Sequence, residues 1–347
     1  MDWMIYGANG YTGQLVVEEA VRRGLRPVLA GRSAASLEPL AHRHGLPVRA
    51  FALDNAQAVR TGLNGIGLVL HCAGPFSHTC APMLEACLEV GAHYLDITGE
   101  IDVFRHCHEQ DARAQKKGIV VLPGAGFDVV PTDCLAAQLK RELPGADSLV
   151  LAFEAGGGPS PGTAKTSVEG LGKGGRARID GELRRVPLAW KTRSFERDGE
   201  QRHAMTIPWG DVYTAFLSTG IPNVEVYMGV SPSTSTRLRR LRWLGPLLGL
   251  PPVQALLKRQ VAGKVQGPSE ATRGSTGCVV WGEVRDREGR EVKRQLRTPN
   301  GYEITVTAAL GIVARLLQGG RPPGGYYTPS KLMGADYVLG LPGVRLD

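Results

Sequence analysis

Gly7-Ala8-Asn9-Gly10-Tyr11-Thr12-Gly13 follows the apolar run Trp3–Tyr6 and opens the amphipathic run Thr12–Arg23. Three glycines at every third position mark a turn from a strand into a helix. Gly7 permits a tight turn, Gly10 lets the backbone approach a ligand, and Gly13 lets the helix pack close to the strand. The free N–H groups at a helix N-terminus bind phosphate. The stretch therefore predicts a strand–turn–helix unit that holds the pyrophosphate of a dinucleotide.

The first 130 residues repeat this alternation of short apolar runs with helical patterns. The expected strands are Trp3–Tyr6, Pro27–Ala30, Val48–Leu53, Gly67–Cys72, His93–Ile97 and Ile119–Leu122. The expected helices are Thr12–Arg23, Leu37–His44, Pro82–Val90 and Val103–Lys117. A β-α repetition of this kind predicts an α/β fold with a doubly wound parallel sheet, the Rossmann arrangement.

The end of the second strand bears on which cofactor is bound. It reads Leu29-Ala30-Gly31-Arg32-Ser33 and lacks the acidic residue that usually holds the ribose 2′-hydroxyl of NAD. Arg32 can instead pair with a 2′-phosphate, with Ser33 and the turn residue Gly31 beside it. The sequence thus favours NADP(H) over NAD(H). The alternative is that Arg32 only stacks on the adenine.

Two further segments are candidate cofactor contacts. Asp54, after the third strand, either contacts the adenine amino group or caps the next helix. The segment after the fourth strand is expected on the nicotinamide side of the crevice, where small residues leave room and a proline fixes the turn; it comprises Cys72, Ala73, Gly74, Pro75 and Phe76.

Hydride transfer needs a source or acceptor of protons beside the cofactor. Glu100 and Asp128 follow the fifth and sixth strands, where the carboxyl ends of a parallel sheet meet. Either could act as a catalytic acid or base if burial raised its pKa. The alternative for both is helix capping or hydrogen bonding between loops.

Composition argues against nucleic-acid-binding, disulfide-bonded and metal-binding classes of protein. The chain has 347 residues and a net charge of +8, but no nucleic-acid-binding motif accompanies the charge, so we expect no nucleic-acid partner. Six cysteines form no C-x-x-C pair, which predicts reduced thiols and a cytoplasmic protein. The adjacent His106, Cys107 and His108 would splay apart on a helix, so we expect no metal site. The first strand begins almost at Met1, and no signal peptide is expected.

The character of the chain changes after about residue 145. Ser148–Glu154 and Val224–Val230 alternate as strands, and Cys278–Arg285 with Glu291–Leu296 reads as a hairpin. Tyr302–Gln318 reads as a long buried helix. We therefore predict a dinucleotide-binding domain over 1–130 and an α+β domain for substrate binding and dimerisation, on a mainly antiparallel sheet, over 131–300. Residues 301–347 should pack back on the first domain, and a homodimer is expected.

Arg237–Lys264 combines a basic rim with an apolar centre interrupted by proline. Such a segment suits contact with an anionic membrane surface or a lipid-bearing partner. The alternative, which the sequence favours, is a helical lid or a dimer contact whose arginines are solvated.

Several of these motifs together resemble the saccharopine dehydrogenase-like oxidoreductases, including their trans-acting enoyl reductase-like and uncharacterised bacterial members. The resemblance is dense over the first 133 residues and rests on Gly7–Gly13, Leu29–Arg32, Cys72–Phe76, Tyr94–Glu100 and Pro123–Asp133. It is thinner over Gly162–Ser167, Gly325–Ser330 and Gly340–Val344.

The resemblance implies a Rossmann domain, NAD(P) use, and oxidation or reduction of a C=C, C=N or C=O bond of a small or lipid-like substrate. It does not imply saccharopine as the substrate. Two alternatives stay open: a dinucleotide-binding sensor or scaffold without catalysis, and a membrane-associated adaptor.

Overall fold

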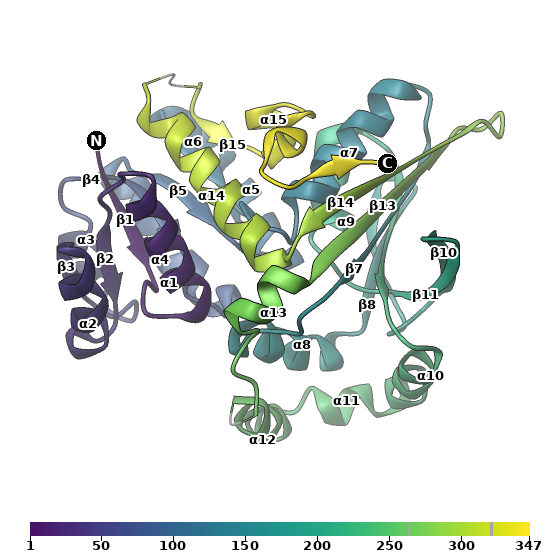
Figure 1. Cartoon of the computed structure of the whole chain (residues 1–347), viewed down its shortest axis with the longest axis horizontal. Coiled ribbons are helices and arrows are strands. Elements are labelled where there is room, and N and C mark those ends of the chain that lie inside the picture. The colour runs from purple at the N-terminus through teal and green to yellow at the C-terminus, as the bar shows by residue number, and fades with distance from the viewer. Residues whose placement is uncertain (263, 320–321) are drawn as a thin grey trace. The chain divides into compact units, whose positions relative to one another are not determined.

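The computed structural model describes residues 1–262, 264–319 and 322–347, and divides into two compact units (Figure 1). The first comprises Met1–Val130 with Tyr302–Met333, and the second comprises Pro131–Gly301 with Gly334–Asp347. Each unit is built on its own sheet.

The first unit carries seven parallel strands in the order β15-β6-β5-β4-β1-β2-β3. The strands are β1 (Asp2–Tyr6), β2 (Val28–Gly31), β3 (Val48–Ala50), β4 (Ile66–His71), β5 (His93–Asp96), β6 (Val120–Leu122) and β15 (Gly325–Tyr326). Because β1 lies between β2 and β4, the chain reverses its direction of winding there. In open α/β sheets, ligands bind at the carboxyl ends of the strands beside such a reversal.

Helices connect these strands: α1 (Tyr11–Arg22), α2 (Ala34–His44), α3 (Ala56–Gly62), α4 (Phe76–Val90), α5 (Ile101–Glu109), α6 (Asp111–Lys117), α14 (Gly301–Leu317) and α15 (Pro329–Met333). The expected single helix Val103–Lys117 is wrong, since the chain bends at Gln110 into α5 and α6. The helix expected from Pro82 begins six residues earlier, and Pro82 lies inside it. These helices bury the central strands along nearly their whole length, as the continuous apolar runs require.

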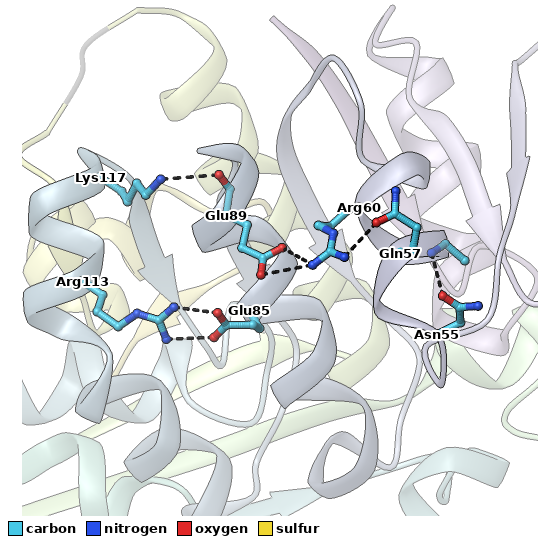
Figure 2. A network of polar contacts seen from close by, with 8 residues as sticks. Asn55, Gln57, Arg60, Glu85, Glu89, Arg113 and Lys117 are labelled. Carbon is cyan, nitrogen blue, oxygen red and sulfur yellow. Dashed lines mark hydrogen bonds and ion pairs between the residues drawn. The ribbon is translucent and has the colours of Figure 1, made fainter.

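Ion pairs join the outer surfaces of α3, α4 and α6 (Figure 2). Arg113 holds Glu85 through both guanidinium nitrogens, at 2.8 and 2.7 Å, and Arg60 reaches Glu89 at 3.1 Å. All four side chains are substantially exposed, so solvent screens each pair and the pairs add little to the stability of the fold. The apolar core beneath them, which includes Met83 and Leu84, holds these helices in place.

The second unit contains a nine-stranded sheet in which β10-β11-β12-β7-β13-β14-β16 form the main path and β8 and β9 pair at its side. The strands are β7 (Ser148–Ala155), β8 (Gly175–Ile179), β9 (Glu182–Val186), β10 (Thr192–Arg197), β11 (Glu200–Thr206), β12 (Asn223–Gly229), β13 (Gly277–Arg285), β14 (Glu291–Pro299) and β16 (Arg345–Leu346). The hairpin of β13 and β14 is confirmed. The sheet is mixed, however, because β7 and β12 pair in parallel.

The helices of the second unit are α7 (Val130–Glu142), α8 (Pro161–Lys173), α9 (Asp211–Thr219), α10 (Pro232–Leu241), α11 (Gly245–Leu248), α12 (Pro251–Ala262) and α13 (Glu270–Ser275). Two short 3₁₀ turns, η1 (Arg242–Leu244) and η2 (Tyr337–Gly340), complete the set. The expectation that all of 301–347 packs on the first domain needs correction. Gly334–Asp347 belongs to the second unit, where β16 pairs with β14. Residues 320 and 321, which belong to the predicted segment 301–347, lie outside the described residues.

None of the helices in the described parts of the chain has the length and apolar character needed to cross a membrane.

Candidate functional site

The glycine turn after β1 has the close packing that its spacing predicts. Gly7 has a φ of +83°, and a Cβ atom placed on it would lie 2.8 Å from the Cβ and backbone nitrogen of Ala73. A Cβ on Gly13 would lie 2.2 Å from the carbonyl oxygen of Gly7. The backbone of β1, α1 and the segment after β4 therefore meet where no other side chain fits.

The N-terminus of α1 is open to an anion. Among the described residues, no side chain caps this helix at Gly10, and its first turn has no acidic residue. Gly10 is exposed, and a Cβ added to it would have the Gly7 carbonyl oxygen as its nearest neighbour, at 3.2 Å. Tyr11 and Thr12 are half-buried and begin the helix, whereas Ala8 is fully buried beneath the turn. We call this turn, Gly7–Gly13, the cradle; an uncapped helix N-terminus of this kind can bind a phosphate group.

The second strand presents Arg32 at the rim of this cradle. Arg32 is exposed, and within the described parts of the chain no carboxylate forms an ion pair with its guanidinium. Gly31 is buried directly before it. The charges of Arg32 and Asp54 both act on the hydroxyl of Tyr6, whose pKa burial raises to about 12. Arg32 and Asp54 therefore lie at one edge of the site.

Hydroxyl groups flank Arg32. Ser33 occupies the N-cap position of α2, yet its side chain makes no capping hydrogen bond. Ser36 donates to the Ser33 carbonyl at 2.9 Å and accepts from the Asn9 amide at 3.2 Å. Sequence reasoning missed Ser36, because its link to the glycine turn spans 27 residues.

Asp54 does not cap the following helix. Asn55 caps α3 instead, by accepting a hydrogen bond from the Ala58 backbone at 3.0 Å. The capping interpretation of Asp54 is wrong, since the cap lies one residue later. Asp54 is exposed beside the cradle, and the adenine contact stays a prediction.

The segment after β4 lies against the glycine turn. The Cys72 backbone donates to the Tyr6 carbonyl at 2.8 Å, and Ala73 packs on Gly7. Gly74 is exposed, and Pro75 stands at the N-cap position of α4, which begins at Phe76. This places small residues at the carboxyl edge of the sheet, beside the reversal between β1 and β4.

Glu100 binds the start of α4 at this edge of the sheet. Its two carboxylate oxygens accept hydrogen bonds from the backbone nitrogens of Phe76 and Ser77, each at 2.9 Å. These are free donors at the first turn of α4, so the negative charge also complements the helix dipole. Of the roles considered from the sequence, the structure favours helix capping for Glu100, because Phe76 and Ser77 open α4.

Asp96 at the end of β5 is buried and fully engaged. One oxygen accepts from the backbones of Thr98 and Gly124, at 3.0 and 2.9 Å, and the other accepts from the Tyr94 hydroxyl at 2.8 Å. Burial raises its pKa to about 6, although these hydrogen bonds oppose the rise. Asp96 thus fixes the loops after β5 and β6.

Asp128 lies on the loop after β6. It is half-buried and covers the backbone of Gly99, where an added Cβ would come within 2.8 Å of its Oδ2. Burial, with a smaller contribution from the charge of Glu100, raises the pKa of Asp128 to about 7. A carboxyl with such a pKa can donate or accept a proton near neutrality.

The long helix α14 completes this side of the first unit. The Tyr302 ring packs edge-on against Tyr11, with centroids 4.9 Å apart. The Thr305 hydroxyl accepts from the Phe127 backbone at 3.0 Å, next to Asp128. The sequence predicted the helix, but it carried no signal for these two contacts, which join segments far apart in the chain.

Comparison with known proteins supports this arrangement. Residues 3–122 match the family described as the saccharopine dehydrogenase NADP binding domain. The chain is 28% identical over 201 residues to a saccharopine dehydrogenase-like oxidoreductase of Mus musculus, covering 50% of this chain and 47% of that protein. It is 31% identical over 151 residues to a trans-acting enoyl reductase of Mycobacterium tuberculosis, covering 40% and 35%. Residues 3–122 therefore belong to the saccharopine dehydrogenase NADP binding domain family. The seven-stranded unit is thus a domain for a nicotinamide dinucleotide.

The fold of the whole chain also matches a solved structure. A saccharopine dehydrogenase (L-Glu forming) from Saccharomyces cerevisiae superposes with a TM-score of 0.67 at 12% identity, covering 100% of this chain and 99% of that chain. At this identity the likeness concerns the fold alone. The chain spans about half the length of the curated relatives of Mus musculus and Bos taurus that it matches.

The structure brings together three potential metal ligands that the sequence did not suggest. The ligand atoms of Cys80, Asp96 and Cys107 lie within 4.8 Å of one another, and all three residues are buried. The two sulfurs are 3.5 Å apart in hydrogen-bonding contact, and burial raises the pKa of Cys107 well above its usual range. Because Asp96 already accepts three hydrogen bonds, the group reads as a buried polar cluster of this saccharopine dehydrogenase-like domain. The expected absence of a metal stays a prediction.

Proposed function

We propose that the protein is an oxidoreductase that prefers NADP(H) and transfers hydride to or from a C=C, C=N or C=O bond of a small or lipid-like substrate. The observation that carries the cofactor preference is Arg32, an exposed guanidinium without a carboxylate partner in the described parts of the chain. It stands at the end of β2, where NAD-binding domains place an acidic residue.

The charge of Arg32 supports recognition of a 2′-phosphate. A guanidinium binds phosphate through two parallel charge-assisted hydrogen bonds, which are stronger than neutral ones. The hydroxyl of Ser33 makes no capping hydrogen bond and can add a donor. The glycine cradle at Gly7, Gly10 and Gly13 would hold the pyrophosphate, and the bound cofactor would supply or accept the hydride.

Asp128 is the proposed acid or base. Its pKa of about 7 suits exchange of a proton with substrate, and it lies on the loop after β6, at the carboxyl edge of the sheet. Glu100 acts on Asp128 indirectly, because its negative charge contributes to the raised pKa of Asp128. Glu100 is better suited to this positioning role, since backbone donors occupy both of its oxygens.

The class of substrate is taken from the relatives. The matching protein of Mycobacterium tuberculosis is named a trans-acting enoyl reductase, which supports an unsaturated, lipid-like substrate here. A dinucleotide-binding sensor without turnover is the second candidate, because Glu100, one of the two expected acid–base residues, is engaged in holding α4.

Titration of the purified full chain with NADPH and with NADH, followed by nicotinamide fluorescence, tests the proposal. We expect NADPH to bind at least tenfold more tightly. Equal or tighter binding of NADH would refute the role of Arg32. Oxidation of bound NADPH by an α,β-unsaturated acyl thioester would separate the oxidoreductase from the sensor, for which binding without oxidation of any substrate class tested is expected.

A further inference from the structure

The second unit carries an exposed surface that is both apolar and basic. Trp243, Leu247 and Leu256 are 79%, 57% and 57% exposed, which is unusual for large apolar side chains. Exposed arginines flank them in sequence on the same run of short helices. We call this set the Trp243 surface; it comprises Arg237, Arg240, Trp243, Leu247, Leu256 and Arg259.

The inner contacts of these helices explain why the other side chains point outward. Gly172 of α8 approaches Gly249 so closely that an added Cβ would lie 2.5 Å from the Gly249 Cα. Gln254 donates to the Val168 carbonyl at 3.0 Å, and Lys258 pairs with Glu169 at 2.6 Å. Figure 1 shows α11 and α12 following one another beneath α8, whereas α10 lies near β11. These helices therefore have a packed inner side and a free outer side.

The charge on this segment has one sign. Residues 226–269 contain seven lysines and arginines and no aspartate or glutamate. Within the described residues, Arg237, Arg240 and Arg259 form no ion pair, and Arg242 stacks over the Trp243 ring at 5.5 Å. Residue 263, and the side chains of 246, 261 and 262, lie outside what the structure describes. A like-charged surface of this kind attracts an anionic partner.

The combination of residues points to a membrane as that partner. Interfacial segments place Trp and Leu in the headgroup region and let Lys and Arg pair with anionic lipids. A protein partner would call for a buried, shaped apolar core with few charges, which this surface does not offer. An open hollow of about 520 Å³ adjoins this surface and is lined in part by Leu171, Leu188 and Trp243.

We propose that the Trp243 surface docks the protein on an anionic lipid bilayer, with Trp243, Leu247 and Leu256 inserted among the headgroups and Arg237, Arg240 and Arg259 paired with lipid phosphates. Docking of this kind is peripheral and reversible. It is independent of the proposed oxidoreductase activity, because every residue that carries it belongs to the second unit.

Co-sedimentation of the full chain with vesicles tests the proposal. The vesicles contain either phosphatidylcholine alone or phosphatidylcholine with phosphatidylglycerol. We expect binding to the anionic vesicles, weak binding to the neutral ones, and loss of binding at high salt, since exposed charges are then screened. The emission spectrum of the wild type minus that of Trp243→Phe reports on Trp243 alone. Its maximum should move to shorter wavelength when the anionic vesicles are added. Absence of binding to the anionic vesicles would overturn the proposal.

Matched variants locate the contact. Trp243→Ser/Leu247→Ser should reduce the partition coefficient about tenfold or more, whereas Val90→Ser/Leu339→Ser, which removes exposed apolar groups elsewhere, should leave it unchanged. Arg237→Glu/Arg240→Glu should weaken binding about tenfold or more. Arg43→Glu/Lys116→Glu changes the net charge equally and should have little effect.

Two outcomes would count against the membrane. If the control variants lost as much vesicle binding as the variants of the Trp243 surface, then net charge or folding, rather than this surface, would control binding. If Trp243→Ser/Leu247→Ser instead converts a dimer into monomers in light scattering without changing vesicle binding, the surface is a contact between copies of the chain. Thermal unfolding of each variant shows that the fold is retained, because the replaced side chains are exposed.

Discussion

Glu100 accepts a hydrogen bond from the backbone nitrogen of Phe76 at 2.9 Å, across 24 residues of sequence. Its second oxygen accepts from the next backbone nitrogen, so one carboxylate satisfies two of the free donors at the start of α4. The loop after β5 is thereby fixed to the start of α4. Both lie at the carboxyl edge of the sheet, where we propose that the dinucleotide binds.

Replacement of this carboxylate should reduce stability. Glu100→Gln keeps one acceptor oxygen but loses the second acceptor and the charge at the helix N-terminus. We expect the free energy of unfolding to fall by about 1–2 kcal/mol in urea denaturation. Glu109→Gln, an exposed position at the end of α5, is the control and should change it by less than about 0.5 kcal/mol. Equal stability of Glu100→Gln and wild type would show that the two hydrogen bonds contribute nothing.

Replacement of Arg32 should separate the two cofactors. Arg32→Ala removes the guanidinium that we assign to the 2′-phosphate, and a charge-assisted hydrogen-bond pair of this kind is worth about 1.5–3 kcal/mol. We expect the Kd for NADPH to rise about 10- to 100-fold and the Kd for NADH to change by less than about threefold. Fluorescence titration measures both. Arg43→Ala, an exposed arginine in α2, is the control; equal losses for NADPH and NADH in Arg32→Ala would instead indicate stacking on adenine.

The glycine turn predicts a contrast between two similar substitutions. In Gly13→Ala the new Cβ would meet the Gly7 carbonyl oxygen at 2.2 Å, and we expect a loss of about 3 kcal/mol in stability. In Gly10→Ala the nearest atom is 3.2 Å away and φ is −74°, so the fold should tolerate it. Because its Cβ would point at the proposed pyrophosphate, Gly10→Ala should still weaken dinucleotide binding about tenfold. Calorimetry of both variants checks the contrast; intact affinity in Gly10→Ala would refute the placement of the phosphates.

The features that sequence reasoning predicted are those with a local cause. The tight turn at Gly7, the close packing at Gly13 and the cationic end of β2 follow from residues adjacent in the chain, so their spacing is informative. The hairpin of β13 and β14 is likewise local, with a charged turn between two alternating runs.

The features that it missed depend on residues far apart in the chain or on strands dominated by charge. The parallel pairing of β7 with β12 is set by the sheet, and alternation within each strand says nothing of direction. Strands β8 to β11 are rich in arginine and glutamate and lack an apolar face long enough to be recognised. The cap of α3 is Asn55, whereas the sequence offers capping as one of two alternatives for Asp54, because Asp54 and Asn55 are both good capping residues.

Asp128 predicts a particular dependence of stability on pH. Its pKa of about 7 in the folded state lies above the ordinary value of 3.8, so between these pH values the folded protein holds a proton that the unfolded chain has lost. The contribution is fully present below pH 4 and is lost as the pH rises through 7. Asp128→Asn carries no such proton. Its stability relative to the wild type should therefore be greater at pH 8 than at pH 5, by about 1–2 kcal/mol after allowing for partial exposure of the side chain. Urea denaturation of both proteins at both pH values measures the difference. A constant difference between the two proteins would show that Asp128 titrates as an ordinary carboxyl and would remove it as the acid or base.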